Sequence, residues 1–218
     1  MSDRQNPPIS PRKQPRQARS AELVAVILQA ATQVLASEGA RRFTTARVAE
    51  RAGVSVGSLY QYFPNKAAIL FRLQTEEWRQ TSELLGSILE DPRQPPLARL
   101  RTLVHVFIQS ECDEAAMRVA LDDAAPLYRD APEAHQARAA GQARFDTFLM
   151  AVLPQASPST RALACDLLVS TLSAVGKRFS ASPRTTAEVH DYAEAMADMF
   201  CAYLNTFDPS QGPVHEPR

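Results

Sequence analysis

Apolar side chains recur along the chain with the spacing of amphipathic helices. From Ser20 onward they fall three or four residues apart, at Leu23, Val26, Ile27, Ala30, Ala31, Val34 and Leu35. Ser20 is placed to cap the start of this helix and Gly39 to end it. The same periodicity marks further stretches at residues 45–52, 56–63, 66–87, 97–112, 114–122, 132–152, 159–179 and 186–207. No stretch shows the strict alternation of a strand, so the sequence predicts an all-α chain.

Prolines separate these stretches. They gather at residues 7–15, 64, 92–96, 126–132, 154–158, 183 and 209–217, where a helix would have to stop. We expect disordered tails at residues 1–19, which are basic and Pro-rich, and at residues 208–218. The start of the chain has no apolar run of a signal peptide, and the longest apolar stretches elsewhere are broken by Arg, Asp or Gln. No segment is therefore expected to span a membrane.

Residues 44–63, TTARVAERAGVSVGSLYQYF, combine the requirements of a helix-turn-helix. Ala49 is the small residue needed where the two helices cross, and Gly53 supplies a left-handed turn between them. The apolar residues around the turn are Val48, Ala52, Val54 and Leu59. The candidate helix caps are Thr44 or Thr45 for the first helix and Ser55 for the second. Together these constraints within one short stretch predict a nucleic-acid-binding motif.

The distribution of charge separates the chain into two parts. Overall, 24 Lys and Arg balance 24 Asp and Glu. Residues 1–72 nevertheless carry 11 basic and 4 acidic side chains, and residues 73–218 carry 13 and 20. A basic part joined to an acidic one is the pattern expected when only one of them meets a polyanion. A solvated basic tail would give part of the same excess, because Arg4, Arg12, Lys13, Arg16 and Arg19 contribute to it.

The segment ERAGVSVGSLYQYFPNK, residues 50–66, resembles the signature of the TetR family of bacterial transcriptional regulators. The resemblance runs from about residue 20 to residue 73, and nothing specific is matched beyond about residue 80. It implies a three-helix, helix-turn-helix DNA-binding domain at residues 20–66 and a larger helical domain at residues 67–207 for effector binding and dimerisation. The implied partners are a double-stranded DNA operator, a second copy of the chain and a small-molecule effector.

Candidate DNA contacts lie on and around the second helix of the motif. The residues expected to face the major groove are Val56, Gly57, Ser58, Gln61 and Tyr62, of which Gln61 is the best reader of a base edge. Thr45, Tyr60, Tyr62 and Lys66 resemble the phosphate-contacting positions of the family. Thr44, at the start of the first helix, and Arg47, on its open side, complete the candidate set. The tail cations Arg12, Lys13, Arg16 and Arg19 either enter an adjacent minor groove or add only nonspecific attraction.

An effector cavity is expected among the helices between residues 84 and 179. The candidate contacts are His105, Phe107, Cys112, Met117, Leu121, Asp122, Tyr128, Phe145 and Phe148. Apolar side chains at helical spacing are more often plain core, and solvation of a helix surface explains the polar candidates equally well.

The last two helical stretches carry surplus apolar side chains. The candidates for a four-helix dimer interface are Leu163, Leu167, Leu172, Val175, Tyr192, Met196, Met199, Phe200 and Tyr203. Packing inside the subunit is the alternative.

The inventory of chemical groups does not fit an enzyme. Phosphate-cradling glycine loops and the hydrolase elbow are absent from the sequence. His105 and Cys112 are seven residues apart, about 10.5 Å along a helix, too far for a nucleophile and its base. We expect no metal and no cofactor. Three widely spaced cysteines suit a reducing cytoplasm.

The sequence thus favours a homodimeric repressor that leaves a pseudo-palindromic operator when a small molecule binds. Two alternatives remain open: activation by the same DNA-binding dimer, and regulation by a protein partner in place of a small effector.

Overall fold

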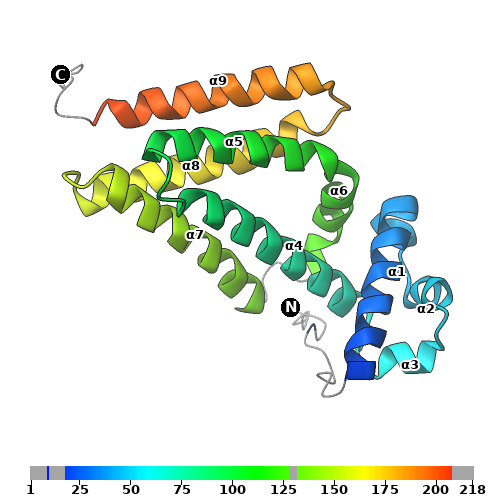
Figure 1. Ribbon diagram of the computed structural model, residues 1–218. Helices are drawn as coiled ribbons and strands as arrows, with labels where there is room; N and C mark the ends of the chain where they lie inside the picture. Colours follow the sequence, from blue (N-terminus) through cyan, green and yellow to red (C-terminus); the bar gives the residue numbers. More distant parts are fainter. Residues whose placement is uncertain (1–8, 10–17, 128–131, 208–218) are drawn as a thin grey trace, which may run out of the picture. The chain divides into compact units, whose positions relative to one another are not determined.

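The structure, a computed structural model, describes residues 9, 18–127 and 132–207, and these residues contain helices but no strand (Figure 1). The helices are α1 (Ala18–Arg42), α2 (Thr45–Ala52), α3 (Val56–Tyr60), α4 (Lys66–Leu89), α5 (Pro96–Asp113), α6 (Ala115–Ala124), the 3-10 turn η1 (Ala125–Leu127), α7 (Pro132–Val152), α8 (Pro158–Phe179) and α9 (Thr186–Asn205). The all-α prediction is confirmed, and most predicted helix ends lie within two residues of those observed. The exceptions are α1, which continues past its expected stop at Gly39 to Arg42, and α3, which ends at Tyr60 instead of Phe63.

The start of α1 differs from its prediction. The helix begins at Ala18, so Ser20 lies inside it and does not cap it. Gly39 interrupts the helix as expected, with φ 72° and ψ 171°, a conformation that disfavours other residues. Ile9 is buried against the same core as α1, although it was expected in a disordered tail. The other tail residues, 1–8, 10–17 and 208–218, lie outside the described part of the chain.

Helix α1 is apolar enough to raise the question of a membrane. Over Ser20–Arg42 it alone, among the described helices, has the length and composition of a membrane span, which the sequence did not lead us to expect. Its apolar residues have another partner, however, because Ile27, Ala31 and Val34 are fully buried in the core of the structure. Core packing therefore accounts for the buried part of this stretch, which is 28% of it.

The chain forms two compact units. The first contains residues 1–79 and 116–137, and the second contains residues 80–115 and 138–218. In the first unit, one hydrophobic cluster joins α1, α2, α3 and the start of α4 to Ala120, Leu121 and Ala124 of α6. The unit that holds the helix-turn-helix thus extends beyond the expected boundary at residue 66, and α6 belongs to it.

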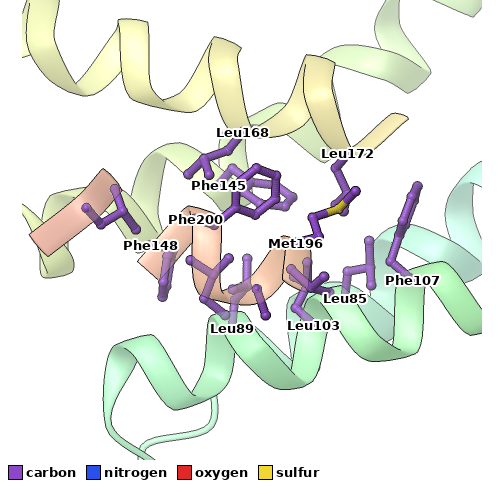
Figure 2. Close-up of a cluster of buried hydrophobic side chains, with 14 of the residues drawn as sticks. Leu85, Leu89, Leu103, Phe107, Phe145, Phe148, Leu168, Leu172, Met196 and Phe200 are labelled. Carbon is purple, nitrogen blue, oxygen red and sulfur yellow. The ribbon is translucent and has the colours of Figure 1, made fainter. Parts of the chain in front are cut away.

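The second unit has a separate core. Figure 2 shows side chains of α4, α5, α7, α8 and α9 pointing into one cluster, among them Phe145, Phe148, Leu168 and Phe200. Helix α5 packs against both α8 and α9. A close approach occurs at Gly86 of α4, where an added Cβ would lie 2.6 Å from Nη1 of Arg144. The neighbouring atoms all belong to the flexible side chain of Arg144, so a larger residue at position 86 would displace that side chain.

Local signals fix the ends of the helices in the second unit. Pro96 and Pro158 occupy first-turn positions, where the missing N–H costs nothing. Thr185 and Glu188 form a reciprocal capping box at the start of α9. The backbone N–H of Thr185 donates to the Glu188 carboxylate at 2.8 Å, and this bond lowers the pKa of Glu188.

Candidate nucleic-acid interface

The first helix of the motif, α2, is capped at both ends as the sequence predicts. The Thr44 hydroxyl accepts a hydrogen bond from the Arg47 backbone N–H at 3.3 Å. At the other end Gly53 adopts the left-handed conformation, with φ 67° and ψ 28°, and its N–H bonds to carbonyls of α2. Val48 and Ala49 are fully buried between the helices. The small residue and the glycine turn therefore have the roles expected of them.

Helix α3 is short, and its start is held by serines. The Ser55 hydroxyl accepts from the Ser58 backbone N–H at 3.0 Å, and the two hydroxyl oxygens lie 2.8 Å apart. Leu59 is fully buried and fastens α3 to the core. The chain then turns at residues 61 and 62, so α3 does not continue to Phe63.

The outer face of α3 is open. Val56 and Tyr60 are exposed to 40% and 38%, and Gly57 and Gln61 are exposed as well. Ser58 is half-buried, because its side chain turns toward Ser55. The accessible surface of α3 thus combines the apolar side chain of Val56, the backbone of Gly57 and the side-chain amide of Gln61.

Two hydroxyl groups meet beside this surface. Oγ1 of Thr45 and the phenol oxygen of Tyr60 lie 3.1 Å apart and are hydrogen-bonded. The bond links the start of α2 to the end of α3 across the turn. Each oxygen retains further hydrogen-bonding capacity, so the pair is suited to a phosphate oxygen.

The start of α4 adds positive charge. The Asn65 side chain accepts from the Ala68 backbone N–H at 2.9 Å and so caps the helix. Lys66 is exposed in the first turn of this 24-residue helix, whose N-terminal dipole is also positive. Other exposed cations of the first unit include Arg41, Arg42, Arg51 and Arg72.

Two expected DNA contacts take other positions. Tyr62 is only 6% exposed and belongs to the core, because the chain turns inward after Tyr60. Arg47 is half-buried and forms an ion pair with Glu38 of α1. The tail cations Arg12, Lys13 and Arg16 lie outside the described residues, as does the side chain of Arg19.

The apolar effector candidates that the structure describes belong to two different cores. Met117 and Leu121 pack in the first core, whereas Phe107, Phe145 and Phe148 pack in the second. The sequence does not say which core a candidate joins. All five are buried or partly buried in these cores, and their role in effector binding stays a prediction.

The polar effector candidates lie in different surroundings. Nε2 of His105 lies 2.7 Å from a carboxylate oxygen of Glu194 on α9. Asp122 is exposed, and Tyr128 lies outside the described residues. Cys112 is half-buried, and burial raises the pKa of its thiol. Burial is also the main cause that raises the pKa of Cys165 to about 12. All three cysteines are free thiols.

An apolar groove of about 520 Å³ lies elsewhere in the second unit. It is lined by the ends of three helices and their loops, at Pro95, Pro96, Leu97, residues 151–156, Leu204, Asn205 and Phe207. Sequence reasoning missed it because these segments are far apart in the chain and carry no local signal of their own.

The dimer candidates divide into exposed and buried groups. Leu163 is exposed to 63% and Met199 to 51%, and Leu167 and Tyr192 are exposed as well. Val175 and Tyr203 are half-buried. Leu172, Met196 and Phe200 were expected at the interface but are buried in the second core, because α8 and α9 each have an inward face.

The part of the chain that the structure describes contains no cluster of three or more His, Cys, Asp or Glu side chains suited to a metal ion.

Comparison with known families identifies both parts of the chain. Residues 27–73 match the model of the bacterial regulatory proteins of the tetR family. Residues 95–207, about half of the chain, match the model of the tetracyclin repressor-like C-terminal domain.

Individual proteins show the same similarity. The nucleoid occlusion factor SlmA of Vibrio campbellii is 39% identical over 83 residues, which are 38% of this chain and 42% of the relative. The match thus spans less than half the length of that relative. A candidate TetR-family transcriptional regulator of Mesorhizobium loti superposes with a TM-score of 0.67 at 20% identity, over 86% of this chain and 98% of its own. The transcriptional regulator FadR of Bacillus subtilis, in complex with stearoyl-CoA, gives a TM-score of 0.61 at 16% identity, over 88% and 99%. At these identities the two structures establish the fold.

Proposed function

Because the chain belongs to the TetR family of transcriptional regulators, we propose that it is a homodimeric repressor released from its operator by a small molecule. The observation that carries this proposal is the surface of α3, held by Ser55 and Leu59, which presents Val56, Gly57 and Gln61 to solvent. A regulator that reads chromosomal operators acts in the cytoplasm of a bacterium.

In this proposal α3 enters the major groove and recognises the base sequence of the operator. The Gln61 amide offers both a donor and an acceptor, the pattern that matches an adenine edge. Gly57 has no side chain and lets the helix approach closely, and Val56 suits contact with a thymine methyl group. Ser58, which is bonded to Ser55, adds a hydroxyl at the edge of this surface.

Register on the duplex is fixed by phosphate contacts around α3. The hydroxyl pair of Thr45 and Tyr60 joins two helices, so one phosphate contact there orients both of them. Lys66 adds a charge at the start of α4, where the helix dipole also favours an anion. The exposed Thr44 hydroxyl accepts a hydrogen bond as the cap of α2 and keeps its own proton to donate to a phosphate.

Repression is relieved through α6. This helix shares the core of the DNA-binding unit, yet it follows α5 after the single residue Glu114. A ligand that changes the packing of α5 therefore acts on the unit that holds α3. The shift in operator affinity equals the difference between the ligand's affinities for the DNA-bound and free conformers.

Dimerisation supplies the second half-site contact. The exposed side chains of Leu163, Leu167 and Met199 provide an apolar surface on α8 and α9 for a second copy. Two recognition helices in such a dimer must meet half-sites about 34–36 Å apart, or a multiple of that distance.

A second candidate function follows from the relative named a nucleoid occlusion factor. The same DNA-binding dimer would then serve nucleoid occlusion and answer to a protein partner in place of a small effector. Genome-wide mapping of bound sites separates the two functions. One or a few promoters favour a regulator, and many dispersed sites favour the alternative. Mapping the effect on transcription also separates repression from activation.

The direct test uses a duplex selected by the protein from random sequences, and two substitutions in the DNA surface. Gln61→Ala should cost about 1–3 kcal/mol at one base pair and relax the preference there. Lys66→Ala should weaken all duplexes alike and reduce the slope of log K against log salt by about one.

Matched controls lie in the second unit. Gln109→Ala and Lys177→Ala remove the same side chains from exposed positions on α5 and α8 and should leave binding unchanged. Full operator affinity in both Gln61→Ala and Lys66→Ala would contradict the assigned contacts. A wild-type protein that selects no sequence would contradict the function itself.

A further inference from the structure

Arg47 lies at an unfavourable place for a cation. It is the third residue after the Thr44 cap of α2, and positive charge in the first turn of a helix is opposed by the helix dipole. Nη1 of Arg47 pairs with the carboxylate of Glu38. The side chains are 41% and 24% exposed, so the pair is partly shielded from solvent. Glu38 thus supplies the negative charge that this helix start favours.

The pair bridges a bend in the chain. Glu38 is the last residue before Gly39, where α1 breaks with φ 72°. Phe43, beyond the bend, is fully buried, and α2 starts two residues later. Glu38 and Arg47 therefore tie the end of α1 to the start of α2 from opposite sides of this corner.

The start of α2 also carries part of the DNA surface. Thr45, two residues before Arg47, shares a hydrogen bond with Tyr60 at the end of α3. A change in the direction of α2 at this corner therefore moves the hydroxyl pair. A direct phosphate role for Arg47, in contrast, would require it to leave Glu38 and would bring an unpaired carboxylate near the anionic duplex.

We infer that Arg47 is a positioning residue, whose pairing with Glu38 holds α2 at the angle that presents Thr45 and Tyr60 to DNA. This inference rests on the proposed function, since it concerns how that DNA surface is held.

The test is a double-mutant cycle with Glu38→Gln, Arg47→Gln and the combined variant, measured on the selected operator duplex at several salt concentrations. Each single substitution should weaken binding by roughly two- to fivefold, the range of partly exposed ion pairs, and the combined variant should be no weaker than the singles. The salt slope should stay unchanged, because no phosphate contact is lost. The charge exchange Glu38→Arg with Arg47→Glu should restore most of the affinity.

A phosphate contact by Arg47 would give the opposite pattern. Arg47→Gln would then lower the salt slope by about one, and Glu38→Gln would tighten binding. This pattern would overturn the inference. So would unchanged affinity in both single variants, or a charge exchange that does not recover binding.

The control Arg51→Gln removes the same charge from the exposed last turn of α2 and measures the effect of net charge alone. Thermal unfolding of each variant separates a shift in binding from loss of fold. A wild-type protein that selects no duplex would overturn the proposed function together with this role. A wild-type protein that binds while its variants follow the phosphate pattern would overturn only the inference.

Discussion

Gly53 and Gly39 adopt positive φ angles in this chain, and each lies where a helix ends or breaks. At Gly53 an added Cβ would meet no atom within 4 Å, so the cost of substitution is conformational and does not come from a clash. The left-handed turn directs α3 away from α2 and brings Leu59 into the core. Backbone freedom at one residue thus sets the angle of the recognition surface.

Substitutions at Gly53 should show whether backbone strain at positive φ, and not a steric clash, determines the cost. We expect Gly53→Ala to lower the free energy of unfolding by about 1–2 kcal/mol. Gly53→Asn should lower it less, since Asn tolerates the left-handed conformation better. Urea unfolding followed by circular dichroism measures both. Equal losses for Ala and Asn would mean that the turn does not need positive φ.

The residues that the sequence located correctly are those with local tasks. Thr44, Ser55 and Gly53 act on backbone groups within four residues, so their type and spacing are sufficient. Tyr62 and Arg47 were misplaced because their environment depends on contacts from elsewhere. The buried position of Tyr62 follows from the early end of α3, and the partner of Arg47 is in another helix.

At the scale of elements, α6 is the helix through which the proposed regulation would act. Ala120 and Ala124 allow it to approach its neighbours closely, and Leu121 fills the core beside them. Nη1 of Arg118 on α6 lies 3.1 Å from Glu77 of α4, with side chains 20% and 15% exposed. The Gln74 amide, from the preceding turn of α4, donates to the same carboxylate at 3.1 Å. A polar link therefore joins α6 to α4 beside the apolar contacts.

Breaking this link should loosen α6. Glu77→Gln or Arg118→Met is expected to lower the free energy of unfolding by about 1–2 kcal/mol, less than for a fully buried pair because some solvent remains. Hydrogen exchange of α6 amides should become faster in both variants. Arg79→Gln is the matched control, since its pair with Glu76 on α4 is more exposed and should contribute below about 0.5 kcal/mol. Unchanged exchange in α6 would show that the apolar contacts suffice.

Helices could be predicted from the sequence, but the partners of each helix could not. The 3.6-residue period of apolar side chains located α5, α6 and α7 to within two residues at each end. It does not say that Met117 and Leu121 join a different core from Phe145 and Phe148. That assignment depends on long-range packing, and for this reason the proposed effector set was scattered.

At the scale of the whole molecule, the proposed dimer depends on the outward faces of α8 and α9. The sequence predicted apolar surplus on these helices, and the structure divides it into core and surface. Leu163 and Leu167 are exposed and lie four residues apart, one turn of α8. Leu172 faces the interior. The spacing of apolar residues alone could not distinguish the buried face of α8 from its exposed face, because α8 is apolar around much of its circumference.

A charge on the outward face should therefore dissociate the dimer without unfolding the subunit. Leu163→Glu and Leu167→Glu are expected to shift the protein toward monomer in sedimentation velocity and to reduce operator affinity. Val119→Glu, at an exposed apolar position on α6, should leave the mass unchanged. Leu172→Ala should instead lower the free energy of unfolding by about 2–5 kcal/mol through a cavity. A dimer that survives both glutamates would place the interface elsewhere.

The discontinuity of the first unit limits how this protein can be dissected. Its polypeptide leaves after Arg79 and returns at Ala116, so a fragment cut at residue 79 lacks Ala120, Leu121 and Ala124. The apolar surface of the remaining helices would meet water, and such a fragment should aggregate instead of reporting on DNA. For the same reason, a chimaera that grafts this DNA reader onto a foreign regulatory half must carry α6 and η1 with it.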